Sequence, residues 1–99
     1  MTKFKTYELA VAFYRECTGV KAKAYIRDQL ERASLSIVLN VAEGAAKPSK
    51  AEKKRFYSIA YASNRECQAI LNILGEKKIF EKADVLGAHL FQLMRSAAS

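Results

Sequence analysis

The sequence is poor in residues that interrupt helices. It has four glycines and a single proline, Pro48, in 99 residues. A turn-rich β fold needs many such residues, so their scarcity excludes that class and favours long helices. A chain of this length also fits one domain and leaves no room for a second. We therefore expect one all-α domain over residues 1–99.

Side chains for catalysis and metal binding are also scarce. The chain has one histidine, His89, and two cysteines, Cys17 and Cys67, without metal-ligand spacing. No glycine-rich loop leads into a helix with a phosphate-binding lysine. We therefore predict a protein that is not an enzyme, with no catalytic residue, no metal and no cofactor. We expect His89 at the surface or an interface, and both cysteines reduced and half-buried.

Long apolar runs are absent as well. No stretch approaches the roughly 18 apolar residues of a membrane-spanning helix. The first residues, Met1 to Lys5, are polar and do not resemble a secretory signal. The sequence thus predicts a cytoplasmic protein that does not contact a membrane.

Positive charge is abundant. Lys and Arg number 17 against 10 acidic residues, which gives a net charge of +7. On so small a body, this excess favours a polyanionic partner such as RNA or DNA. The alternative is a basic surface that serves only solubility.

Apolar residues at spacings of three and four predict four helices, over residues 4–17, 22–43, 49–74 and 81–97. Short connections between them give an up-down-up-down antiparallel four-helix bundle. We expect residues 76–80 to form a turn. The predicted buried face of the first helix is Phe4, Tyr7, Val11 and Tyr14, widened by Ala10 and Phe13. That of the last helix is Val85, Leu86, Leu90, Leu93 and Met94.

Local signals mark where these helices begin and end. Gly44 and Gly75 follow the second and third apolar patterns, where a glycine usually stops a helix. Ser49 and Glu52 have the spacing of a capping box at the start of the third helix. The second helix is apolar nearly all round, so we expect a second copy of the chain to cover one of its sides. Asn40, inside that stretch, needs a hydrogen-bond partner on a neighbouring helix or subunit.

The corner between the second and third helices is the main basic cluster. In an antiparallel bundle it lies beside the start of the first helix and the end of the fourth, and this end holds eight cationic and three acidic residues. Cations in the first turn of a helix oppose its dipole, so their retention suggests a binding need rather than solvation alone. The predicted phosphate-binding residues are Lys47, Lys50, Lys53, Lys54 and Arg55, with a second rim of Lys21, Lys23, Lys77 and Lys78.

Two pairs of side chains near this corner have alternative interpretations. Glu43 and Glu66 are expected to form ion pairs with Arg55 or Arg65 rather than to act as a carboxylate pair. Tyr57 and Tyr61 lie one helical turn apart, where they could stack on bases or, as we favour, pack at an interface.

The second and third helices also carry an ordered motif. It comprises Gln29 to Ile37, Asn40 to Gly44, Ser49, and Arg55-Phe56, Ile59-Ala60, Ala62-Ser63 and Glu66. This pattern resembles the bacterial four-helix-bundle family first noted in reading frames within intervening sequences of large-subunit ribosomal RNA genes. The motif covers a little under half of the chain closely. Ala62 and Cys67 depart from it where the family usually has Gly and Leu, and both are conservative changes inside a helix.

The resemblance implies an antiparallel bundle that assembles into a homo-oligomeric ring, a pentamer in known cases. It also implies kinship with the accessory variability determinant proteins of diversity-generating retroelements, which are basic partners of a reverse transcriptase. Six matching residues are read as determinants of fold and assembly: Ser36, Asn40, Glu43, Gly44, Ser63 and Glu66.

We therefore expect a non-enzymatic, oligomeric nucleic-acid-binding accessory protein that contacts the RNA or DNA backbone. A reverse transcriptase is its possible partner. The alternative is a protein-interaction scaffold of the same family with no direct role in nucleic-acid binding.

Overall fold

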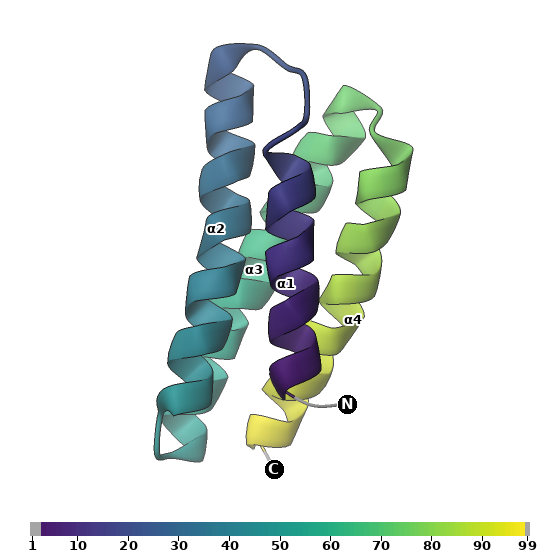
Figure 1. Cartoon of the computed structure of the whole chain (residues 1–99). Coiled ribbons are helices and arrows are strands. Elements are labelled where there is room, and N and C mark those ends of the chain that lie inside the picture. Colours follow the sequence, from purple (N-terminus) through teal and green to yellow (C-terminus); the bar gives the residue numbers. More distant parts are fainter. Residues whose placement is uncertain (1–2, 99) are drawn as a thin grey trace.

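A computed structural model describes residues 3–98, which form the antiparallel four-helix bundle that the sequence predicts (Figure 1). Each helix packs on two neighbours: α1 and α3 each contact both α2 and α4. The bundle measures 40 × 21 × 18 Å. Both described chain ends lie at the same end of the bundle as the α2–α3 connection, shown at the bottom of Figure 1. The helices are α1 (Lys3–Cys17), α2 (Ala24–Ala46), α3 (Lys50–Leu74) and α4 (Lys77–Ala98).

The predicted face of α1 is confirmed for Ala10 and Phe13 and wrong for Phe4 and Tyr7. Phe4 is 70% exposed and Tyr7 39%, whereas α1 buries the adjacent stripe of Thr6, Ala10, Phe13 and Cys17. The exposed and the buried residues both recur at helical spacing. The buried stripe contains one aromatic side chain, Phe13, and otherwise only small side chains. Small residues let neighbouring helices approach closely, so this stripe faces the core.

Helix α2 continues past its predicted end. Gly44 lies within the helix and is buried. A Cβ at this position would lie 2.6 Å from Cε1 of Tyr57. The glycine therefore permits close packing of α2 on α3 and does not stop the helix. The helix ends at Ala46. Lys47 is extended (ψ 143°), the conformation favoured before a proline such as Pro48.

The predicted limits of α3 are confirmed. The backbone N–H of Glu52 donates to Oγ of Ser49 at 3.2 Å, as a capping box requires. The carboxylate contacts the serine hydroxyl at 3.4 Å. At the other end, Gly75 adopts the left-handed conformation (φ 73°) that terminates the helix.

Helix α4 begins at Lys77, so the turn expected over residues 76–80 is wrong. The carbonyl of Glu76 accepts the N–H of Phe80 at 3.0 Å, and no glycine or proline interrupts this first turn. The predicted α4 face holds for Leu86, Leu90 and Leu93, which are buried. Val85 is 54% exposed and does not belong to the core.

Candidate nucleic-acid interface

Three predicted cations lie exposed at the basic corner. Lys50, Lys54 and Arg55 occupy the first two turns of α3, directly after the corner. Within the described residues, none of them forms an ion pair. Arg55 lies over the ring of Phe56, with its guanidinium carbon 5.3 Å from the ring centroid. This cluster, the exposed corner, therefore keeps its positive charge available to an anion.

The other two corner cations are partly engaged inside the chain. The Lys53 Nζ donates to the carbonyls of Ala45 at 3.1 Å and Gly44 at 3.4 Å. It thereby caps the last turn of α2, whose carbonyls lack helical partners. Burial, and then the nearby Lys3, lower the pKa of Lys53. Lys47 pairs with Glu43 at 3.3 Å and also lies over the Phe56 ring.

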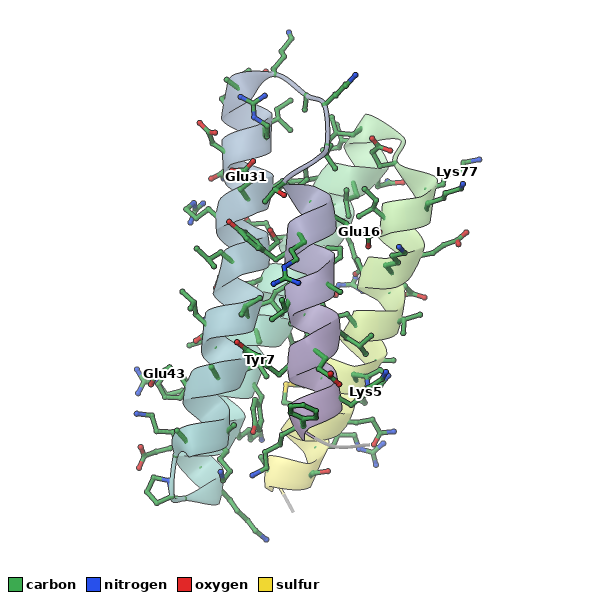
Figure 2. The ribbon with its side chains drawn as sticks, viewed as in Figure 1. Lys5, Tyr7, Glu16, Glu31, Glu43 and Lys77 are labelled. Carbon is green, nitrogen blue, oxygen red and sulfur yellow. The ribbon has the colours of Figure 1, made fainter. Side chains whose placement is uncertain are left out.

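The second predicted rim lies at the opposite end of the bundle. Lys21 and Lys23 are exposed in the α1–α2 connection, and Lys77 and Lys78 are exposed in the first turn of α4. Figure 2 shows Lys77 at the end away from Lys5 and Glu43. The structure therefore does not bring the two groups together. A ligand that contacts both would have to run along the bundle.

The predicted assembly residues are grouped mainly along the α2–α3 contact. Ser36 and Ser63 share a hydrogen bond of 2.9 Å between the two helices. The Asn40 Nδ2 donates to the Ser36 carbonyl at 2.8 Å and to its hydroxyl at 3.1 Å. Among residues 3–98, Asn40 thus bonds within its own helix and not to a neighbouring one, and it supports the hydroxyl that joins α2 to α3.

The expected ion pairs of the two glutamates are wrong. Glu66 pairs with Arg32 at 3.9 Å, across the α2–α3 contact, and Glu43 pairs with Lys47, the residue that follows its own helix. Both pairs are largely exposed, so each contributes little to stability. Because neither glutamate engages Arg55 or Arg65, these arginines stay outside the network that joins the helices.

The α3–α4 contact holds residues that the sequence analysis missed. Asn64 is completely buried, and its Nδ2 donates to the carbonyl of Ala83 at 3.0 Å while its Oδ1 has no donor in the described chain. A Cβ on Gly87 would lie 2.8 Å from that Oδ1. A glycine inside a helical pattern often marks such a close approach, so Gly87 was the available signal.

A groove of about 330 Å³, the α3–α4 groove, lies beside this contact. Its walls include Tyr61 and Phe91, whose ring centroids are 5.9 Å apart. Gln68 and Asp84 line its other end, where Gln68 Nε2 donates to Asp84 Oδ1 at 3.4 Å. Tyr57, by contrast, is buried against Gly44 and cannot stack on a base. The remaining lining residues are Asn64, Arg65, Gly87 and Ala88.

The described residues offer no group of three or more His, Cys, Asp or Glu side chains that could hold a metal ion.

The two cysteines, Cys17 and Cys67, are buried rather than half-buried. Burial raises the pKa of the Cys17 thiol to about 12 and also raises the pKa of the Cys67 thiol. His89 is half-buried, and its Nδ1 has no partner among the described residues. Across residues 3–98, none of the helices has the length and apolar character needed to cross a membrane.

These features define a small all-α bundle with cations concentrated at one end and a polar network along the α2–α3 contact. The family comparison agrees with the class predicted from the motif. The chain belongs to the family of 23S rRNA-intervening sequence proteins, whose model matches residues 3–96. No curated protein and no solved structure matches the chain.

Proposed function

We propose that this chain is a non-enzymatic nucleic-acid-binding accessory protein that acts as a homo-oligomer. The exposed corner carries the proposal, because Lys50, Lys54 and Arg55 have no acidic partner in residues 3–98. Lys50, in the first turn of α3, opposes the helix dipole, and a phosphate backbone would relieve that cost. Lys47 and Lys53 border the cluster and serve partly to fix the corner.

Binding of this kind depends on phosphates and carries little base sequence information. Each cation that neutralises a phosphate releases a counterion, so affinity should fall steeply as salt rises. A fivefold ring, as the family resemblance implies, would carry five copies of the +7 chain and present a strong field to RNA or DNA.

The outer surface of α2 and α3 supports assembly. Leu39 is 54% exposed, Ile59 40% and Leu35 39%, although each belongs to the apolar pattern of its helix. Leu35 and Leu39 lie within one turn of Ser36, and Ile59 lies one turn before Ser63, so the Ser36–Ser63 hydrogen bond holds all three at a similar height in the bundle. Tyr25 and Ile73, further along the same two helices, are also exposed. We infer that a second copy covers this apolar row, the α2–α3 surface.

The same row supports a second candidate function, a protein-interaction scaffold. A reverse transcriptase, the partner suggested by the resemblance, could cover the α2–α3 surface in place of a second copy. The basic corner would then be secondary. Catalysis is the least supported function, since the described residues bring together no nucleophile, base and oxyanion donor.

The test is a triple reversal, Lys50→Glu, Lys54→Glu and Arg55→Glu. Acidic residues suit the first turns of a helix, so the variant should fold. We expect it to bind a generic 20-nucleotide RNA or duplex DNA at least about tenfold more weakly at low salt, with a shallower salt slope. Fluorescence anisotropy across a salt series measures both quantities.

A matched control reverses Lys21, Lys23 and Lys77 at the opposite end and should lose less affinity. Salt-independent binding by the wild type, or equal binding by the triple-reversal variant, would contradict the proposal. If nucleic-acid binding survives the reversal while association with a reverse transcriptase is lost, the scaffold function is the correct one.

A further inference from the structure

We propose that the α3–α4 groove binds a single nucleobase of a single-stranded nucleic acid, a site separate from the phosphate-binding corner. The inference rests on the proposed function for the strand itself and adds a contact to its bases. It is carried by an exposed ring, a hollow beside it and hydrogen-bond acceptors at the far end of that hollow.

The ring is Phe91 on α4, which is 42% exposed despite its size. Tyr61 from α3 lies beside it, and the Arg95 guanidinium carbon lies 5.8 Å from the Phe91 ring centroid. Aromatic faces flanked by arginine are the usual stacking surfaces of proteins that bind single strands. Arg65, which also lines the groove, provides a second cation for the flanking phosphates.

Gly87 lines the hollow. A side chain there would meet the buried amide of Asn64, so the two helices approach closely and the groove lies over glycine and Ala88. Its volume of about 330 Å³ is at the lower end of the range for ligand clefts, roughly 300–1,000 Å³. The groove therefore suits one base better than a larger ligand.

The polar end of the groove offers acceptors. Asp84 is exposed and accepts one long hydrogen bond from Gln68 through Oδ1, which leaves its second carboxylate oxygen available to a ligand. A carboxylate attracts the amino group of cytosine and repels a carbonyl at the same position, as in uracil or thymine. It also repels phosphate. The charge pattern thus favours a base in the groove with its phosphates near Arg65 and Arg95.

The experiment compares three DNA strands of equal length: oligo(dC), oligo(dT) and an abasic strand with the same phosphates. Fluorescence anisotropy at one low salt concentration gives the affinity of the 99-residue chain for each. We expect oligo(dC) to bind about fivefold to a hundredfold more tightly than the abasic strand, the range for loss of one stacked base. Oligo(dT) should fall between them.

Two variants locate the effect. Phe91→Leu keeps an apolar side chain but removes the ring, and Ala88→Leu fills the groove from an exposed position. Both should bring the oligo(dC)-to-abasic ratio close to one. Ala69→Leu makes the same enlargement at an exposed α3 position outside the groove and should keep the ratio.

The outcomes separate this inference from the proposed function. Tight, salt-dependent binding of all three strands with equal affinity overturns the groove site and leaves the phosphate contacts intact. Failure to bind any strand overturns both proposals. A ratio that persists in both groove variants places the base contact elsewhere and overturns the site. Displacement of the strand by an equal concentration of free cytidine monophosphate assigns the groove to a free nucleotide and overturns strand recognition.

Discussion

Helix α3 packs against α2 and α4 through a glycine on each of these helices, but the surfaces beside the two contacts differ. On one side Gly44 of α2 receives the ring of Tyr57, and on the other Gly87 of α4 receives the amide of Asn64. The α2–α3 contact is closed further by the Ser36–Ser63 hydrogen bond. The α3–α4 contact instead leaves a groove of about 330 Å³. A glycine thus brings two helices together, and the neighbouring side chains decide whether the surface above them is filled.

The outward residues differ in kind as well. Leu39 and Ile59 help to make the α2–α3 surface apolar, which suits a permanent protein contact. Phe91, Asp84 and Arg65 make the α3–α4 groove aromatic, polar and charged, which suits a reversibly bound ligand. If this division is correct, damage to one surface should leave the function of the other unchanged.

The largest effect is expected from Leu39→Glu. Leu39 is 54% exposed in the single chain, so the change costs the bundle little. In an assembly through the α2–α3 surface, it would place an unpaired charge in an apolar contact, which costs several kcal/mol. We expect the oligomer to dissociate into folded monomers, as measured by light scattering and circular dichroism.

Val85→Glu is the matched control, since Val85 on α4 has the same 54% exposure. It should leave the subunit count of the assembly unchanged. A wild-type protein that is monomeric at micromolar concentration would contradict assembly altogether. If only the Val85 variant dissociates, the subunit interface lies on the α4 side of the bundle and not on the α2–α3 surface.

A smaller effect is expected from Gly44→Ala. The added Cβ would lie 2.6 Å from a ring atom of Tyr57, a side chain only 2% exposed that cannot swing into solvent. Overpacking costs about 1–3 kcal/mol, and the better helix propensity of alanine returns up to about 1 kcal/mol. We expect a net loss of about 1–2 kcal/mol in the free energy of unfolding, measured by urea denaturation.

The same change at Gly87 meets the smaller amide of Asn64 and should cost less. Tyr57→Leu combined with Gly44→Ala should lose less stability than the two single changes added together, because the smaller side chain removes the clash. Additive losses would show that Gly44 is required for a reason other than contact with Tyr57.

The four-helix bundle was predictable because signals along its helices agree with one another. Ser49, Glu52 and Gly75 set the limits of α3 by local chemistry, and the structure confirms them. The end of α2 was not predictable, because Gly44 serves a contact with Tyr57, thirteen residues on, that no local pattern reports. The candidate nucleic-acid interface was likewise predictable only in part. The positions of the lysines follow from topology, but the capping role of Lys53 depends on where its long side chain lies.

The smallest effect concerns the pH dependence of stability, which tests the packing of α4 near the basic end. Burial, and then the charge of Lys5, lower the pKa of His89 from its usual 6.5. The unfolded chain therefore takes up a proton first as pH falls below 6.5, and the free energy of unfolding decreases until the folded pKa is passed. Above pH 6.5 both states are neutral at this residue and the effect vanishes. Urea denaturation between pH 5 and 8 should show this decrease in the wild type and a flatter profile in His89→Gln, whereas identical profiles would place His89 in full contact with water.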